Sequence, residues 1–211
     1  MTRRTRPAGT AAPPSDSKRE RTPLAEEDAA GGTVLLIVDM LGDWQFPEAD
    51  ALLSRALAIA PMIRALKQRC QTAGIPTIYA NDNHGRWRSD FRTLVQAGLD
   101  AGGRREQIGQ LLLPDKEDYF VLKPKQSAFF ATPLDLLLSH LQARRLLLTG
   151  VAAEQCLLAS AFDALMRDYE VICPQDCLAS HSQERHDQAM RHLTDVLKVD
   201  TRPSTQLDWP P

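Results

Sequence analysis

The sequence of 211 residues lacks a long apolar run and an excess of either charge. No apolar stretch approaches the ~20 residues that a membrane-spanning helix needs, so we expect no membrane partner. Lys and Arg number 25 against 27 Asp and Glu, which gives a formal net charge of -2. Because no basic face dominates, the composition argues against nucleic acid as a partner. We expect a small molecule, neutral or weakly charged, as ligand or substrate.

Cysteine is also scarce, and its spacing fits no disulfide framework of a secreted protein. The four cysteines are Cys70, Cys156, Cys173 and Cys177. Cys173 and Cys177 lie in CPQDC, which is wider than a CxxC redox motif and has no second pair to complete a zinc site. We therefore expect a reducing, cytoplasmic setting and structural roles for these two residues.

Sequence motifs for cofactors are absent as well. There is no GxGxxG after a predicted strand and no P-loop, so nothing supports a dinucleotide or nucleotide cofactor, and we predict none. The GxSxG motif of serine hydrolases is missing too. Cys156 remains as the only well-placed nucleophile.

The chain divides into a tail and one domain. Residues 1–32 are rich in Pro, Ala, Ser, Thr and charge, and without apolar periodicity they are predicted to be disordered. Arg3, Arg4 and Arg6 suggest a targeting signal, but no hydrophobic region follows, so a dispensable tail is the favoured interpretation. Residues 33–211 are long enough for a single domain, and the chain's 43% hydrophobic content is sufficient for one sizeable core.

Short apolar runs alternate with helical patterns along this domain. Strands are predicted at 33–39, 76–80, 119–122, 145–149 and 170–173, with an edge strand at 199–201. Helices are predicted at 49–73, 104–113, 133–142, 154–168 and 182–197. This order predicts an α/β fold, a three-layer α/β/α sandwich with a mostly parallel, doubly wound sheet. Ligands bind beyond the carboxyl ends of such strands, where Asp39, Asn81 and Gly150 fall.

Cys156 lies where a buried strand, a small-residue turn and a helix meet, in LLLTGVAAEQCLL. Amides at the start of a helix favour a thiolate and can hold a developing oxyanion, so we expect an activated thiol. Asp39, after the first strand, can act as its base. Lys123 is the candidate for a cation near this carboxylate. Each of the three residues also has an ordinary explanation, since buried Cys is often inert, Asp often caps a turn, and Lys is usually a surface cation.

Three segments resemble the isochorismatase-like cysteine hydrolases, the nicotinamidase/isochorismatase superfamily. They are VLLIVDMLGDWQFPE at 34–48, VLKPKQSAFFATPLDLLL at 121–138 and TGVAAEQC at 149–156. The resemblance implies a catalytic triad of Asp39, Lys123 and Cys156, with Lys125 as an ordinary cation. It also implies a cis peptide between Val151 and Ala152, an oxyanion hole formed by the amides of Ala152 and Cys156, and a homo-oligomer, either a dimer or a tetramer.

The expected activity is that of an amidohydrolase that cleaves a small amide, ureide or carbamoyl substrate through a thioester on Cys156. One alternative is a vinyl ether hydrolase of the isochorismatase type, although that activity goes with replacement of the Cys in the family. Another is a noncatalytic small-molecule-binding or thiol redox protein on the same scaffold.

The loop from Asn81 to Phe91 bears on the substrate and on a possible metal. Asp82 and His84 have the DxH form that supplies two zinc ligands in the nicotinamidase branch, but no further His follows before His140, and we predict no metal. Arg86 and Arg88 in this loop could bind a carboxylate, or, with Trp87 and Phe91, could equally form an oligomer contact. The side chains expected to line the pocket are Trp44, Phe46, Asn81, Trp87 and Phe129. We expect His181, His186 and His192, on or beside the last helix, to be exposed.

Overall fold

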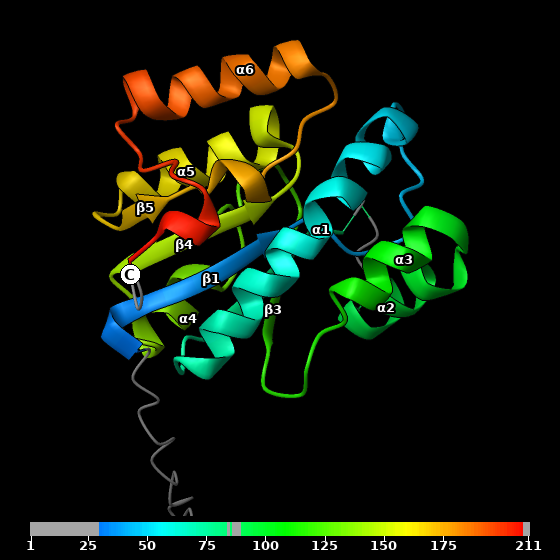
Figure 1. The fold of residues 1–211 in the computed structure, drawn as a ribbon. Coiled ribbons are helices and arrows are strands. Elements are labelled where there is room, and N and C mark those ends of the chain that lie inside the picture. Colours follow the sequence, from blue (N-terminus) through cyan, green and yellow to red (C-terminus); the bar gives the residue numbers. More distant parts are fainter. Residues whose placement is uncertain (1–29, 84, 86–89, 209–211) are drawn as a thin grey trace, which may run out of the picture.

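The protein is described by a computed structural model that covers residues 30–83, 85 and 90–208. Within these residues, five strands form one parallel sheet in the order β3-β2-β1-β4-β5. The strands are β1 (Thr33–Val38), β2 (Thr77–Asp82), β3 (Tyr119–Lys123), β4 (Arg145–Gly150) and β5 (Glu170–Ile172) (Figure 1). The order of the strands confirms the doubly wound topology, because the chain leaves β1 first toward one edge and later toward the other.

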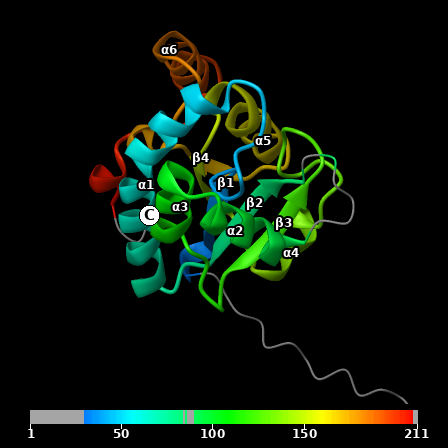
Figure 2. The same ribbon diagram turned by 90° about the vertical axis from the view of Figure 1, so that its right-hand side faces the viewer.

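The helices are α1 (Ala49–Thr72), α2 (Phe91–Asp100), α3 (Gly103–Leu111), α4 (Leu134–His140), α5 (Leu158–Leu165) and α6 (Gln183–Arg191). They cover both faces of the sheet, as Figures 1 and 2 show. The expected three-layer α/β/α sandwich is therefore confirmed. None of the helices in the described residues combines the length and apolar content that crossing a membrane requires.

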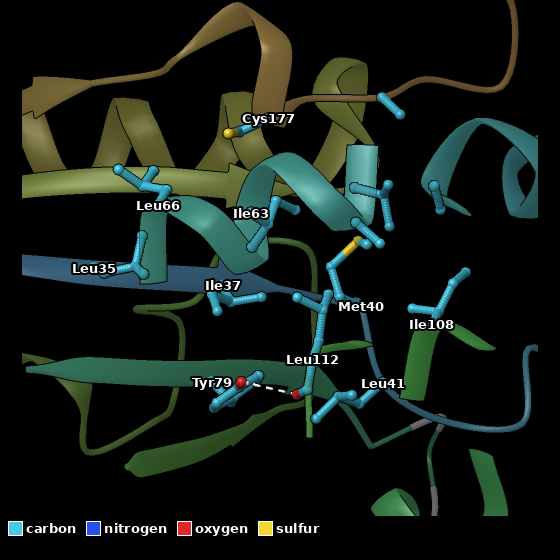
Figure 3. Close-up of a cluster of buried hydrophobic side chains, with 14 of the residues drawn as sticks. Leu35, Ile37, Met40, Leu41, Ile63, Leu66, Tyr79, Ile108, Leu112 and Cys177 are labelled. Carbon is cyan, nitrogen blue, oxygen red and sulfur yellow. Dashed lines mark hydrogen bonds between the residues drawn. The ribbon is translucent and has the colours of Figure 1, made fainter. Parts of the chain in front are cut away.

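Every residue of β1 is buried, because successive side chains of a strand point to opposite faces and both faces are covered. Leu35 and Ile37 join the core beneath α1, α2 and α3. Figure 3 shows this core, with Ile63 and Leu66 of α1 beside β1. Leu36 points the other way, into the core formed with α4, α5 and α6. The continuous apolar run in the sequence thus reflects a central strand.

Several predicted boundaries differ from the structure. The predicted helix 154–168 is a π-helical turn, η2 (Ala153–Leu157), continued by α5, which ends at Leu165. The predicted edge strand 199–201 is wrong, since Asp200 makes only an isolated bridge to Ile172. The helix α2 was not predicted from the sequence, although Asp90 caps it by accepting a hydrogen bond from the Thr93 amide at 2.9 Å.

The predicted tail, residues 1–32, lies outside the described residues except for its last three. Ala30–Gly32 form a short 3-10 turn, η1, that leads directly into β1.

Candidate active site

Four neighbouring strands end at one edge of the sheet and bring together residues that are far apart in the sequence. Asp39 follows β1, Asp82 ends β2, Lys123 ends β3 and Gly150 ends β4. The register pairs Asp82 with Lys123 and Val38 with Gly150. Since all these strands are parallel, their polar ends meet at the carboxyl edge, where ligands bind in such folds.

The Lys123 side chain is completely buried and reaches across β2 toward β1. Its Nζ lies 2.8 Å from Asp39 Oδ2, 3.3 Å from Cys156 Sγ and 3.6 Å from Asp82 Oδ2. It also donates to the carbonyl of Lys125, whose own side chain is exposed. The structure therefore brings Lys123, not Lys125, into contact with the carboxylate and the thiol.

The electrostatics keep Lys123 charged despite its burial. Burial alone lowers the pKa of the ammonium, but the attraction of Asp39, the sulfur of Cys156 and Asp82 outweighs it and holds the pKa above its ordinary value. A permanent cation therefore lies beside both the sulfur and the carboxylate.

Asp39 is held rigidly at the end of β1. Its φ of 52° places it in the left-handed region, which Asp tolerates better than most residues. One carboxylate oxygen accepts the Asp82 amide at 2.7 Å while the other pairs with Lys123, and 17% of the side chain remains exposed. The carboxylate is thus oriented on one side by the backbone and on the other by the ammonium.

The position of Cys156 depends on the close approach of β4 to β1. Gly150 has a φ of 113°, and a Cβ there would lie 2.1 Å from the carbonyl oxygen of Val38, so only glycine fits. One residue further on, the peptide bond between Val151 and Ala152 is cis, the form that the resemblance implies. The chain then turns into η2, which carries the thiol to Lys123.

The expectation of a readily ionised thiol is wrong for the resting protein. Burial, together with the charge of Asp39 and a hydrogen bond to it, raises the pKa of Cys156 to about 12, and Lys123 offsets this rise only in part. The desolvation of the thiolate and the nearby carboxylate therefore exceed the benefit of the ammonium. Cys156 is a neutral thiol that must lose its proton during a reaction.

The amides around the turn indicate where an oxyanion could bind. The amides of Gln155 and Leu157 donate to the carbonyl of Ala152, at 3.0 and 3.3 Å, and the amide of Ala153 donates to Ala179. The amide of Ala152 makes no such loop or turn bond within the described residues. It therefore stays a candidate oxyanion donor, together with the amide of Cys156.

A cavity of about 270 Å³ opens over this edge of the sheet. The residues that line it include Asp39, Trp44, Phe46, Asn81, Asp82, Cys156 and His181. Asn81 donates to the Leu41 carbonyl at 2.9 Å. Asn81 Oδ1 and Trp44 Nε1 are buried without a hydrogen-bond partner in the described part of the chain. Three of the expected lining residues, Trp44, Phe46 and Asn81, thus reach the cavity.

Phe129 is not a pocket residue, and that prediction is wrong. Its ring packs in the core on the α4 and α5 side, with a ring centroid 6.1 Å from that of Tyr169 and the Arg167 guanidinium 4.8 Å above its face. The segment after Lys123 turns toward α5 because Ser127 bonds Asp163 and Ser160 accepts the Ala128 amide. Trp87, Arg86 and Arg88 lie outside the described residues.

The expectation that His181 is exposed is wrong as well. Its side chain is only 9% exposed, lines the cavity, and places Nδ1 2.7 Å from the Glu154 carboxylate. The loop after β5 returns to the carboxyl edge, where the amide of Ala179 donates to the Gly150 carbonyl. His186 and His192 are half-buried. A histidine nine residues beyond the end of β5 gave only a weak signal, because spacing does not reveal that the loop turns back.

The described residues supply no further ligands for a metal ion beside Asp82. They contain no group of three or more His, Cys, Asp or Glu side chains placed to hold an ion. Asp82 faces Lys123 instead, and His84 lies outside the described residues.

The fold places the protein in the class of parallel three-layer α/β proteins. Its site consists of a thiol, a carboxylate and an ammonium group at the carboxyl edge of the sheet. Within that class, the family model of the Isochorismatase domain matches residues 33–201. The chain belongs to this family.

Similar proteins agree with this assignment. The chain is 36% identical over 173 residues to YaaI, an uncharacterized isochorismatase family protein of Bacillus subtilis, a match that covers 82% of this chain and 94% of that protein. An isochorismatase-like hydrolase from Alkaliphilus metalliredigens is similar with a TM-score of 0.67 and 25% identity, over 82% of this chain and 95% of that one. A pyrazinamidase/nicotinamidase from Streptococcus mutans is similar with a TM-score of 0.63 and 27% identity, over 80% of this chain and 99% of that one.

Proposed function

We propose that the protein is a cysteine amidohydrolase that cleaves a small amide, ureide or carbamoyl compound through a covalent intermediate on Cys156. The observation that carries this proposal is the position of Lys123 Nζ, in contact with both the Asp39 carboxylate and the Cys156 sulfur. A nucleophile, a base and a cation within reach of one cavity are the groups that acyl transfer requires.

In the first half of the reaction, Asp39 takes the proton of Cys156 as the sulfur attacks the carbonyl carbon. Coupling the two steps avoids a free thiolate, which the raised pKa of Cys156 makes costly. The Lys123 ammonium stabilises the charge that develops on sulfur, and the amides of Ala152 and Cys156 are the proposed donors to the oxyanion. The C–N bond then breaks, and ammonia or an amine leaves with the proton from Asp39.

In the second half, water hydrolyses the intermediate. Asp39 accepts a proton from water as its oxygen forms a bond to the carbonyl carbon. The C–S bond then breaks and the sulfur recovers a proton, which restores the thiol and the carboxylate. Asp39 alternates between base and acid, a role that suits a carboxylate whose two oxygens are fixed by Asp82 and Lys123.

The cavity supports a small and neutral substrate. Its volume of about 270 Å³ is at or below the lower end of ligand pockets. No Lys or Arg lines it among the described residues, whereas Asp39, Glu48 and Asp82 do. These carboxylates favour an uncharged amide over a free acid, while Trp44 and Phe46 supply an apolar wall.

Two other functions have less support. A vinyl ether hydrolase of the isochorismatase type would use Asp39 as an acid and would not need a thiol, so the contact between Cys156 and Lys123 would be without purpose. A noncatalytic binding or redox protein would not need a buried cation between a carboxylate and a thiol, an arrangement that leaves the sulfur protonated.

The proposal is tested by assaying release of ammonia or amine from a panel of neutral primary amides, ureides and carbamoyl compounds. Wild type and the Lys125→Met control, which alters only an exposed side chain, are expected to turn over the same substrate. Cys156→Ala is expected to be inactive on it. Turnover by Cys156→Ala at the wild-type rate would rule out the thiol mechanism. Cleavage of a vinyl ether that persists in Cys156→Ala and is lost in Asp39→Asn would favour the alternative chemistry.

A further inference from the structure

Glu154 and His181 form a buried pair beside Cys156. The Glu154 carboxylate lies 2.7 Å from His181 Nδ1 and accepts the backbone amide of His181 at 3.2 Å through the same oxygen. Their side chains are 14% and 9% exposed. A double contact of this kind fixes both the backbone and the ring of His181.

This pair ties the ring to the nucleophile. Glu154 lies in η2, two residues before Cys156, and His181 comes directly before Ser182, the N-terminal cap of α6. The ring is therefore anchored to the same turn that carries the thiol. A shift of η2 would therefore move the histidine together with the thiol.

The contact with Glu154 also determines what the ring can offer to a ligand. A carboxylate accepts hydrogen bonds, so Nδ1 carries the proton that it donates. In the neutral ring, Nε2 then has a lone pair and acts as an acceptor. Nε2 makes no hydrogen bond within the described part of the chain, and His181 lines the cavity that contains Cys156. The cavity thus holds an oriented acceptor that has no hydrogen-bond partner among the described residues.

We propose that His181 is a substrate-binding residue whose Nε2 accepts a hydrogen bond from an N–H group of the bound amide. The inference rests on the proposed function and narrows its substrate class to compounds with a free N–H next to the carbonyl, such as primary amides and ureides. N,N-disubstituted amides of the same size leave the acceptor unpaired and bind less well.

Covalent labelling tests this contact without knowledge of the natural substrate. The probes are N-ethyl-2-chloroacetamide and N,N-dimethyl-2-chloroacetamide, which alkylate Cys156 with loss of chloride. They are isomers of nearly equal size, and only the first has an amide N–H group. The rate at Cys156 is followed by peptide mapping, which separates it from the other cysteines. The ratio of the two rates is divided by the same ratio for glutathione, which corrects for intrinsic reactivity.

Wild type is expected to show a corrected preference of about threefold to tenfold for the N-ethyl amide, the range that one hydrogen bond supplies. His181→Phe, which keeps a ring of similar size, is expected to reduce the preference to about one. His181→Gln, with an acceptor oxygen, is expected to restore part of it. The control His140→Phe changes an exposed residue at the end of α4 and should leave the preference unchanged.

An equal preference in wild type and His181→Phe would overturn the inference, as would a wild-type preference of one. The ratio is insensitive to a general loss of thiol reactivity, because both probes report on the same variant. Labelling requires no hydrolysis, so it can fail while Cys156-dependent turnover holds. It can equally succeed on a protein that hydrolyses no amide, in which case only the proposed function fails.

Discussion

At the scale of single residues, Lys123 matters most for the proposed site because it introduces a charge into the core. The ammonium is fully buried and its charge is balanced by Asp39 and Asp82. Burying an ion is unfavourable unless partners compensate, and removal of one partner leaves the others uncompensated. The same ammonium is therefore expected to matter for stability and for activity.

Replacing Lys123 by Met keeps the length of the side chain and removes the charge. We expect a loss of about 100-fold or more in kcat/KM, because the developing negative charge loses its cation. We also expect a loss of about 3–5 kcal/mol in the free energy of unfolding, because Asp39 becomes an unpaired buried charge. Steady-state assays and urea unfolding measure the two effects, and Lys125→Met is the matched control. Equal activities in the two variants would contradict the assignment.

The Cys156 thiol makes the stability depend on alkaline pH. Its pKa is 9.0 in a model compound and about 12 in the folded protein, so the unfolded chain loses the proton first as the pH rises. The contribution to stability is complete below pH 9 and is lost progressively up to about pH 12. Burial also raises the pKa of Cys70, Cys173 and Cys177, so the four thiols together make the stability fall at alkaline pH.

Cys156→Ser removes this titration at nearly constant volume. Between pH 8 and pH 10, the variant is expected to lose about 1.4 kcal/mol less unfolding free energy than wild type. Urea unfolding at several pH values measures the difference. Parallel curves for the two proteins would mean that the folded thiol titrates normally.

At the scale of elements, the end of β4 fixes the geometry of the site. Gly150 allows the backbone to touch Val38, and the turn that follows delivers Cys156 to Lys123. A side chain at Gly150 would have to push β4 away from β1. The distance between the thiol and the ammonium would then grow.

Gly150→Ala is therefore expected to destabilise the protein by more than about 2 kcal/mol and to abolish activity. The control is Gly31→Ala, at a φ of 62° and a ψ of 16° with nothing within 4 Å of the added Cβ. This variant should lose only about 1 kcal/mol, from backbone strain. Chemical unfolding of both measures the difference, and equal losses would show that the contact with Val38 is unimportant.

Some elements of the fold could be predicted from the sequence and others could not. Strands and most helices were predictable because their apolar periodicity is strong, and Lys123 and Asp39 met because parallel strands share one carboxyl edge. The helix α2 was missed because its start lies in a polar loop. Its first residue, Phe91, stacks on Phe120 with ring centroids 4.5 Å apart, a contact between residues distant in the sequence. His181 and Phe129 were misplaced because loop paths depend on contacts distant in the sequence, such as that between Ser127 and Asp163.

At the scale of the whole molecule, the exposed apolar residues concern assembly. Phe120 is 52% exposed and Leu136 is 78% exposed, and both line a groove beside the edge strand β3. Large exposed apolar side chains are often found where proteins associate. This feature is compatible with the homo-oligomer that the resemblance implies.

We expect a dimer or a tetramer in solution. Size-exclusion chromatography with light scattering measures the mass directly, and the chain mass of 23.5 kDa sets the scale. A mass of one chain at every concentration tested would contradict the expectation. The result would leave the active site unaffected, since all the residues assigned to it come from one chain.

The most direct test of the account is the mass of Cys156 during turnover. Rapid acid quenching of wild type with a substrate from the amide panel, followed by peptide mapping, should reveal the peptide that contains Cys156 heavier by the acyl or carbamoyl group. The same adduct should be absent from Cys156→Ser and should accumulate when hydrolysis of the intermediate is slowed. Turnover with an unmodified Cys156, or an undiminished rate in Cys156→Ser, would contradict the central claim.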